Sequence, residues 1–197
     1  MSRLERIVGT EIIDDIRLGH TWYEFGVLYL LIGSQLSLGK SLTFVEIGVH
    51  EGGLSYMLIP KFPKLNYIGV EINCDIVRPE VRQLYLNNEQ AGLICDDCYS
   101  DSIANILNGI TPKIIYCDGG GKAKELKHFK TLCHSGDILA SHDYHDGELE
   151  LVGIPPEYYP TKPEVSPEDI VHMIEDETFE SISVPFPGTR IVAWRKL

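Results

Sequence analysis

The chain has 197 residues, of which 44% are hydrophobic and 23% are charged, a mixture typical of a globular domain rather than a disordered or fibrous protein. This length suits a single domain with a substantial core. The formal net charge of −12 repels phosphate backbones and anionic lipid surfaces, so we expect neither a nucleic-acid partner nor a membrane partner.

The amino-terminal stretch "MSRLERIVGTEIIDD" lacks the uninterrupted apolar core of a signal peptide, and the apolar run near Phe25 is too short to span a bilayer. We therefore expect a cytoplasmic protein. Its cysteines are odd in number and scattered, which argues against a disulfide framework and favours ordinary thiols, even for the Cys95–Cys98 pair. They are Cys74, Cys95, Cys98, Cys117 and Cys133.

The first 40 residues predict two helices, near Arg3–Arg17 and Tyr23–Leu36. After them, short apolar runs alternate with helix-like segments. This alternation predicts right-handed βαβ units and a parallel sheet with helices on both faces. The strand-like runs are "LTFVEIG", "LNYIGVEI", "AGLIC", "KIIYCDG" and "DILASHD". Of the helices between them, one has Pro79 at its start, and another carries Leu126 and Phe129 on one face.

The carboxy-terminal part predicts a helix capped by Ser166, with Pro167 in its first turn, and then two strands joined by a tight "PFPG" turn. Strands joined so closely form an antiparallel hairpin. The predicted fold class is thus α/β: a Rossmann-like, doubly wound sheet of seven strands, five parallel plus the hairpin, in one domain. The proline-rich stretch 144–167 is predicted to be a lid over the sheet.

Acidic or polar side chains stand at the end of each parallel strand: Glu46, Glu71, Asp96 with Asp97, Asp118, and His142 with Asp143. In open α/β sheets, ligands bind outside these carboxyl ends, so we expect the side chains to share one site. The first turn departs from the dinucleotide fingerprint, because His50 stands where a pyrophosphate needs glycine. A ligand with an ammonium, a sulfonium and ribose hydroxyls, as in S-adenosylmethionine, fits an acidic rim better.

The segments "VEIGVHEGG", "YIGVEIN", "LICDDCYSD" and "YCDGG" resemble successive motifs of class I S-adenosylmethionine-dependent methyltransferases. Together with "SHDYHD" they are similar to the branch that contains macrocin-type and rhamnosyl O-methyltransferases and the cephalosporin hydroxylase-like proteins. The resemblance covers about Thr43 to Asp143. It implies methyl transfer (EC 2.1.1.-) from S-adenosylmethionine to a hydroxyl of a small molecule or sugar.

The resemblance also implies roles for individual residues at the cofactor. Glu46, Gly48 and Gly52 would shape the methionine end of the site. Glu71 would accept hydrogen bonds from the ribose hydroxyls. Asp97 would accept one from the adenine amino group, with Cys98 beside the ring, although Asp96 could take its place. The full cofactor set is Glu46, Gly48, Gly52, Glu71, Asp97, Cys98 and Asp118.

In the branch that the sequence resembles, a divalent metal is often held by an acid after the fourth strand and a pair of acids after the fifth. The matching positions are Asp118, His142 and Asp143, which we expect to bind Mg²⁺ or Mn²⁺ if a metal is used. His142 departs from this pattern, because imidazole suits other metals better than magnesium. It could instead be the general base, and Asp143, Lys122 and His145 are further catalytic candidates.

Two other functions remain open on the sequence alone. One is a domain of the same fold that binds a nucleoside ligand or a partner chain without catalysis, and the other is a nicotinamide or flavin oxidoreductase. The apolar helix near Leu28–Ile32 could pack against a second copy of the chain, which would make the protein a homo-oligomer. The lysines of "KAKELKHFK" are interpreted as a solvated helix face.

Overall fold

The computed structural model of the protein describes residues 5–7, 10–13, 15–17, 19–20, 22–39, 41–144, 165–182 and 190–197. Most of the predicted lid, its histidine His145 and the predicted "PFPG" turn lie outside the described residues.

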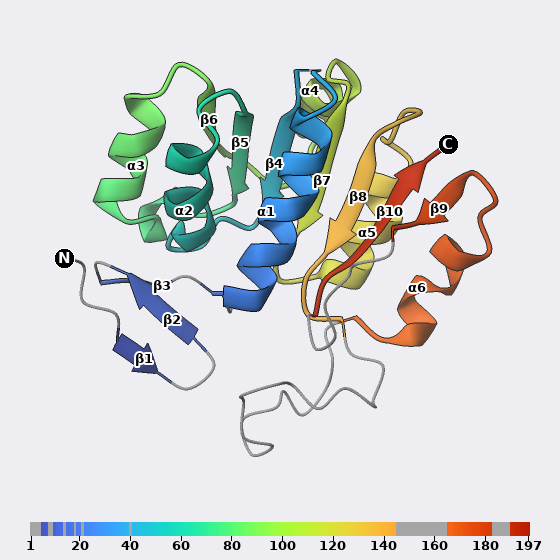
Figure 1. Ribbon diagram of the computed structural model, residues 1–197, viewed down its shortest axis with the longest axis horizontal. Coiled ribbons are helices and arrows are strands. Elements are labelled where there is room, and N and C mark those ends of the chain that lie inside the picture. Colours follow the sequence, from blue (N-terminus) through green and yellow to red (C-terminus); the bar gives the residue numbers. More distant parts are fainter. Residues whose placement is uncertain are drawn as a thin grey trace.

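A seven-stranded sheet forms the centre of the molecule, with the strand order β6-β5-β4-β7-β8-β10-β9 (Figure 1). Five strands are parallel, and β10 runs antiparallel to both β8 and β9. This arrangement confirms the predicted fold class. The strands are β4 (Thr43–Ile47), β5 (Asn66–Glu71), β6 (Ala91–Cys95), β7 (Lys113–Cys117), β8 (Ile138–Ser141), β9 (Phe179–Ser181) and β10 (Val192–Lys196).

The strand order reverses beside β4, the first strand of the parallel set. The chain adds β5 and β6 on one side of β4 and then returns to add β7 and β8 on the other. The connections that leave β4 and β7 therefore diverge, and a crevice opens outside their carboxyl ends. The sheet thus places the predicted strand-end residues around a topological switch point.

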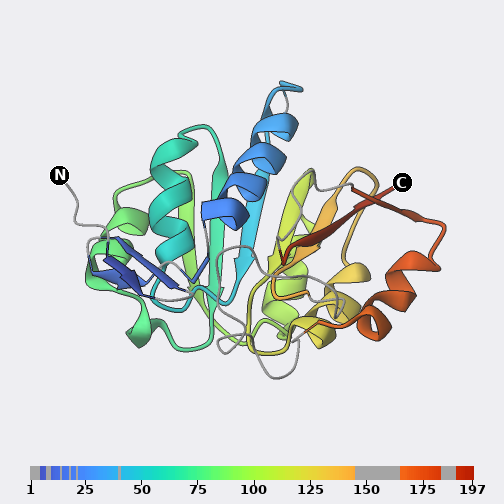
Figure 2. The ribbon, with the colours of Figure 1, turned by 60° about the horizontal axis from the view of Figure 1, so that its bottom comes forward.

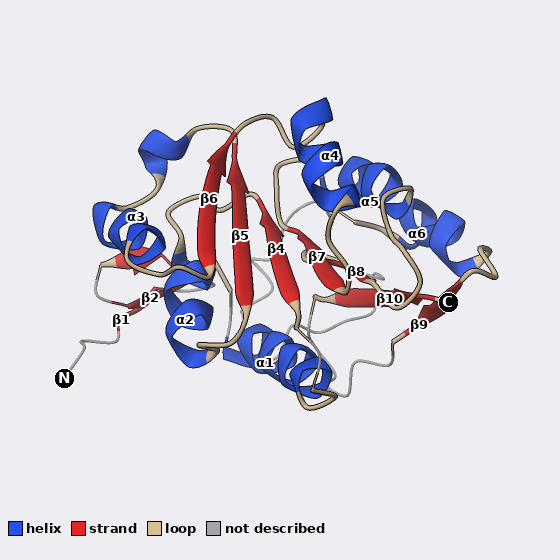
Figure 3. Ribbon diagram, turned by 90° about the horizontal axis from the view of Figure 1, so that it is seen from above, coloured by secondary structure: helices blue, strands red, loops and turns tan. Residues whose placement is uncertain are grey.

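Helices cover both faces of the sheet (Figure 3). Successive strand residues point to opposite faces, so Phe44, Tyr67 and Tyr116 pack with α1, α2 and α3, whereas Val45 and Ile115 pack with α4, α5 and α6. The helices are α1 (Trp22–Leu36), α2 (Gly53–Lys61), η1 (Cys74–Ile76, one 3₁₀ turn), α3 (Pro79–Leu86), α4 (Asp101–Asn108), α5 (Lys122–Lys130) and α6 (Pro167–Ile174).

The predicted helix signals are present where the sequence places them. Ser166 and Asp169 form a reciprocal capping box at the start of α6, and Pro79 opens α3. Leu126 and Phe129 of α5 are fully buried against the sheet, as the helical spacing predicts. These local signals fix where the helices begin and which face they bury.

The predicted helix near Arg3–Arg17 is wrong. These residues contain β1 (Glu5–Ile7), β2 (Thr10–Ile13) and β3 (Ile16–Arg17), an antiparallel three-stranded sheet. The segment is rich in isoleucine, whose branched side chain favours strands, and this preference outweighs the helical spacing. The small sheet lies on the side where the parallel strands end (Figures 1 and 2), and the Arg17 amide donates to Glu51 Oε2 at 3.3 Å.

The prediction of unpaired cysteines is also wrong, because Cys74 and Cys95 form a disulfide. Their positions explain the bond: Glu71 is paired with Cys95 in the parallel β5–β6 register, and Cys74 follows three residues later. The disulfide joins the loop after β5 to the end of β6. Disulfides are rare in the reducing cytosol, which runs against the expected cytoplasmic location. That location stays a prediction.

Helix α1 uses most of its apolar surface inside the domain. Leu28 and Ile32 are fully buried against the sheet, whereas Tyr29 and Leu30 are exposed. The homo-oligomer stays a prediction. Tyr29 and Leu30 are exposed apolar side chains of α1 that could contact a second copy of the chain. Of the described helices, none combines the length and the apolar character needed to cross a bilayer.

Candidate active site

Two cavities open at the carboxyl ends of the parallel strands. The larger, of about 540 Å³, lies outside β4, β7 and β8, and the smaller, of about 350 Å³, lies between the turns that follow β5, β6 and β7. Gly48, Glu71, Gly119 and Gly120 line both, so the cavities adjoin. Of the predicted site residues that the structure describes, all except Gly52 line one or both of them. Glu46, Gly48, Glu71, Asp118, Lys122, His142 and Asp143 line the larger cavity, and Gly48, Glu71, Asp97 and Cys98 line the smaller.

The two predicted glycines have different tasks. Gly48 has a φ of +86°, and a Cβ there would lie 2.6 Å from Gly119 Cα, so only glycine lets the turns after β4 and β7 meet. Gly52 has a φ of +92°, and its Cβ would lie 2.5 Å from Val81 Cγ1 on α3. Gly48 therefore shapes the cavities, whereas Gly52 permits the start of α2 to pack on α3.

Glu46 is the most deeply buried of the strand-end acids, with 1% of its surface exposed. Its Oε2 accepts hydrogen bonds from Ser55 Oγ and from the Tyr67 hydroxyl, both at 2.7 Å. Burial disfavours the charged form more than these two hydrogen bonds favour it, and the pKa of Glu46 rises to about 8. At neutral pH this carboxyl group is therefore mostly protonated in the protein alone, and a cationic ligand beside it would favour ionisation.

Glu71 stands at the end of β5, where the two cavities adjoin. Its Oε2 accepts a hydrogen bond from the His50 amide at 2.8 Å, and its Oε1 accepts one from the Asn73 amide at 3.0 Å. These two amides fix the orientation of a side chain that is only 7% exposed. Each carboxylate oxygen has two lone pairs, so the group can also accept hydrogen bonds from a ligand in either cavity.

The structure distinguishes Asp96 from Asp97. The two oxygens of Asp96 accept hydrogen bonds from the Asp97 amide and from Ser100 Oγ, both at 2.8 Å, and Ser100 caps α4. Asp97 is exposed at the smaller cavity, with Oδ1 accepting from the Tyr99 amide at 3.0 Å. Of the two, Asp97 is therefore the better placed to meet a ligand. Burial raises the pKa of the neighbouring Cys98 thiol to about 12, so this side chain lines the smaller cavity as a neutral, weakly polar group.

His142 lies between two carboxylates in the wall of the larger cavity, and a third, that of Asp143, is 3.5 Å from its Nδ1. Its Nδ1 lies 3.0 Å from Asp118 Oδ1, and its Nε2 lies 3.2 Å from Glu24 Oε1. Burial alone would lower the pKa of His142, but the carboxylates of Glu24 and Asp118 outweigh it and raise the pKa to about 10. In the protein alone His142 therefore carries its proton at neutral pH, which argues against its predicted role as the general base.

Asp143 is bound by two cations. Its Oδ1 lies 2.6 Å from an Arg190 nitrogen, and its Oδ2 lies 3.1 Å from Lys122 Nζ. Lys122 is also buried, and it donates to the Gly119 carbonyl at 3.0 Å. The interpretation of the α5 lysines as a solvated face is thus wrong for Lys122. The predicted set of Asp118, His142 and Asp143 fits Mg²⁺ poorly, because one member is an imidazole and both carboxylates already face cations. Lys122 and Arg190 neutralise Asp143, and His142 and Lys122 lie 3.0 Å and 3.7 Å from Asp118 Oδ1.

Three residues of this cluster were missed in the sequence: His20, Glu24 and Arg190. His20 is buried; its Nε2 lies 2.8 Å from the Tyr116 hydroxyl and 3.5 Å from Asp118 Oδ2. Its ring stacks on His142 with 4.4 Å between the centroids. All three lie outside the segment 43–143 that carries the resemblance. Helical spacing does not relate them, because His20 precedes α1, Glu24 lies in its first turn and Arg190 precedes β10.

No protein-family model and no curated protein matches the sequence. Solved structures do resemble the fold. A methyltransferase from Geobacter sulfurreducens is 15% identical with a TM-score of 0.56, and 90% of this chain aligns with 80% of that one. The SAH-bound methyltransferase PaMTH1 of Podospora anserina is 13% identical with a TM-score of 0.54, and 87% of this chain aligns with 78% of that one.

A mutant of MtNAS in complex with S-adenosylmethionine is 17% identical with a TM-score of 0.53. The alignment includes 89% of this chain but only 63% of MtNAS, so this chain spans less than two thirds of that protein. At such identities the likeness concerns the fold alone. The chain has the α/β, Rossmann-like methyltransferase fold.

Proposed function

We propose that the protein is an S-adenosylmethionine-dependent methyltransferase that methylates a hydroxyl group of a small molecule or sugar. The observation that carries this proposal is the position of Glu71. Its carboxylate is fixed by two backbone amides at the end of β5 and faces two adjoining cavities at the switch point of the sheet. The ribose of an adenosyl cofactor, with its two neighbouring hydroxyls, fits this acceptor group.

The smaller cavity suits the adenine. Ile72 and Val70 supply apolar surface, and Asp97 offers a carboxylate oxygen for the adenine amino group. The methionine end would then enter the larger cavity between Gly48 and Glu46, where the ammonium and sulfonium groups meet Glu46 and Asp118. These cationic groups favour the charged form of the Glu46 carboxyl group. Binding of the cofactor would therefore release a proton from Glu46.

Methyl transfer needs alignment more than activation, since the sulfonium is already a good leaving group. The acceptor oxygen forms a bond to the methyl carbon, the sulfur–carbon bond breaks with its electron pair staying on sulfur, and the hydroxyl proton leaves to a base. His142 and Lys122 carry protons in the protein alone, so we assign them a charge-stabilising role near the acceptor oxygen. Asp118 and Asp143 are the carboxylates of the same wall that can receive the proton. Burial opposes their ionisation, but the neighbouring cations outweigh it and lower the pKa of both, so both are ionised and weakly basic.

The sequence resemblance to macrocin-type and rhamnosyl O-methyltransferases supports a sugar-like or other small hydroxyl acceptor. The size of the larger cavity, about 540 Å³, leaves room for such an acceptor beside the methionine end of the cofactor. The acceptor would lie toward His20, His142 and Arg190, opposite the Glu71 end.

Thermal unfolding with and without ligand tests the proposal. S-adenosylhomocysteine at 100 times its dissociation constant should stabilise the fold by about 2.7 kcal/mol and raise the melting temperature by several degrees, whereas NAD should not. Glu71→Ala should abolish the shift. Glu89→Ala removes an exposed acid that lines neither cavity and should leave the shift intact. Stabilisation by NAD, or an undiminished shift in Glu71→Ala, would contradict the proposal.

A further inference from the structure

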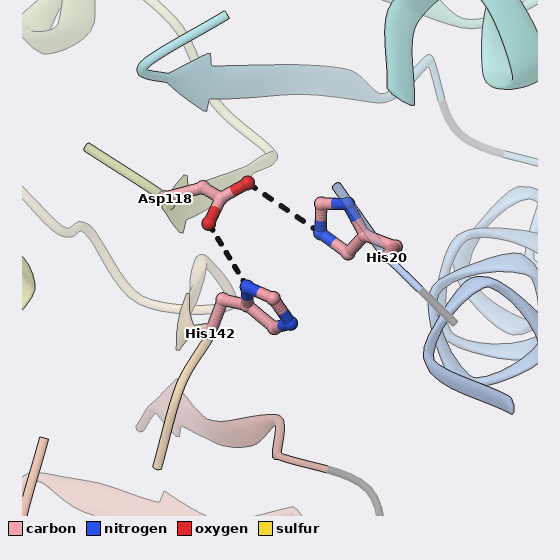
Figure 4. A group of neighbouring side chains, drawn as sticks. All are labelled: His20, Asp118 and His142. Carbon is pink, nitrogen blue, oxygen red and sulfur yellow. Dashed lines mark hydrogen bonds and ion pairs between the residues drawn. The ribbon is translucent and has the colours of Figure 1, made fainter. Parts of the chain in front are cut away.

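Two histidines and an aspartate from distant segments converge in the wall of the larger cavity. His20 precedes α1, Asp118 follows β7 and His142 follows β8, and in Figure 4 both imidazoles direct a nitrogen toward the Asp118 carboxylate. One donor atom of each residue lies within 4.8 Å of the other two. Both histidines are buried, so the fold itself brings these donors together.

The separations between Asp118 and the two imidazoles are close to those that a small metal ion requires. Zinc binds imidazole nitrogen and carboxylate oxygen at about 2.1 Å, so two donors at a tetrahedral angle lie about 3.4 Å apart. Asp118 Oδ1 lies 3.0 Å from His142 Nδ1, and Asp118 Oδ2 lies 3.5 Å from His20 Nε2, so each imidazole faces a different oxygen of the carboxylate. An ion between the carboxylate and the two imidazoles would draw the donors together from separations of up to 4.8 Å and would replace the hydrogen bond between His20 Nε2 and the Tyr116 hydroxyl. The three residues line the cavity, which leaves the remaining coordination positions open to a ligand.

The surroundings of His142 provide an independent observation. Histidines that bind metals usually direct their second ring nitrogen at a carboxylate, which fixes the ring and its tautomer. The second nitrogen of His142, Nε2, lies 3.2 Å from Glu24 Oε1, and Arg190 Nε holds the same oxygen at 2.8 Å. His142 Nδ1 is thereby aimed at Asp118. Asp143 Oδ2 also lies 3.5 Å from His142 Nδ1, but Arg190 and Lys122 already hold the two oxygens of Asp143 at 2.6 Å and 3.1 Å, so we leave Asp143 out of the donor set.

We propose that His20, Asp118 and His142 form a binding site for a first-row transition-metal ion, with Zn²⁺ or Fe²⁺ bound in preference to Mg²⁺. Two imidazoles and one carboxylate are the donor set that such ions favour, whereas Mg²⁺ favours oxygen ligands. Binding displaces the proton of His142, and Lys122, whose Nζ lies 3.7 Å from Asp118 Oδ1 and 3.1 Å from Asp143 Oδ2, remains paired with Asp143. The role of the ion rests on the proposed function: at an open position it would bind the acceptor hydroxyl and lower its pKa.

Cobalt binding to the metal-free protein, without S-adenosylmethionine, tests the site directly. Co²⁺ has visible absorption that reports its ligands, and we expect one ion per chain, displaced by Zn²⁺ but not by a hundredfold excess of Mg²⁺. Loss of an outer carboxylate partner weakens metal binding by about 10- to 100-fold, so His20→Ala, which removes a ligand, should weaken it by at least about 100-fold. His50→Asn removes an exposed histidine of the same cavity and should bind Co²⁺ as the wild type does.

Equal affinity of wild type and His20→Ala, or displacement of Co²⁺ by equimolar Mg²⁺, would overturn the proposal. Because His20 is buried, the variant could fail to fold, so X-ray absorption of the wild-type zinc complex provides a second measurement. Two imidazole ligands support the site, and one or none overturns it. The thermal shift with S-adenosylhomocysteine is independent: a cofactor that binds to a protein without metal affinity refutes this inference alone, and the reverse result refutes the proposed function alone.

Discussion

Replacement of Glu46 by glutamine should change how the stability of the protein depends on pH. The Glu46 carboxyl group has a pKa of about 8 in the folded protein, against an ordinary value of 4.5. A group whose pKa is raised by folding binds its proton more tightly in the folded state, so stability is lost as the pH rises from the unfolded to the folded value. Since glutamine does not titrate, the variant lacks this loss.

The two pKa values set the size of the effect. One pKa unit corresponds to about 1.4 kcal/mol, so the rise from 4.5 to about 8 corresponds to about 5 kcal/mol in all. Between pH 6 and pH 9 the contribution of Glu46 should fall by about 2–3 kcal/mol, because this range spans the pKa of the folded state. Glutamine Oε1 can still accept from Ser55 and Tyr67, which hold the same oxygen of Glu46 in the wild type.

Urea unfolding of wild type and Glu46→Gln at pH 6 and pH 9 measures the effect. The difference between the two proteins isolates Glu46, because His142 and the other titrating groups are common to both. We expect the variant to gain about 2–3 kcal/mol relative to wild type between the two pH values. A difference in free energy of unfolding that stays constant over this range would show that Glu46 does not titrate between pH 6 and pH 9, and its pKa of about 8 would be refuted.

Two further predictions concern stability. The Cys74–Cys95 disulfide closes a loop with a sequence separation of 21, so its reduction should lower the free energy of unfolding of the wild type by about 3 kcal/mol. The same reductant should leave the stability of Cys74→Ser unchanged. Equal melting temperatures of the wild type with and without reductant would contradict this prediction. Arg190→Gln should cost about 3–5 kcal/mol in urea unfolding, because it leaves the buried Glu24 without its arginine partner. Arg195→Gln breaks an exposed pair with the same 2.8 Å separation and should cost less than about 1 kcal/mol, so similar losses in the two variants would refute the argument from burial.

The main sheet could be predicted because its signals are local and repeated. Each parallel strand is a short apolar run between the two helix layers. Helices α3, α4 and α6 begin at a proline or a capping serine, namely Pro79, Ser100 and Ser166. The amino-terminal segment failed because its strands are only two to four residues long, too short for alternation to be distinguished from helical spacing. Its strand preference lies in the branched side chains alone.

The candidate site could be predicted in part for the same reason. Residues at strand ends share one rim once the sheet is known, which places Glu46, Glu71 and Asp118 together. His20 and Arg190 could not be found this way, since their position depends on how segments outside the parallel strands fold back over the rim. The pKa values of Glu46 and His142 were equally hidden, because burial and neighbouring charges, not residue type, decide them.

The disulfide shows how pairing depends on register. Cys74 and Cys95 are distant in sequence, but the β5–β6 register places Glu71 beside Cys95, and the chain then needs only one turn to bring Cys74 back. The bond ties the Glu71 loop to the strand that leads into Asp97. We infer that it holds together the ribose and adenine ends of the proposed cofactor site.

A crystal structure with S-adenosylhomocysteine tests the central claim most directly. We expect both ribose hydroxyls to donate hydrogen bonds to the Glu71 carboxylate. The adenine should lie beside Asp97 and Cys98, and the amino-acid end near Gly48 and Glu46. An adenosyl group bound elsewhere on the molecule, or bound in the crevice with its ribose turned away from Glu71, would contradict the account.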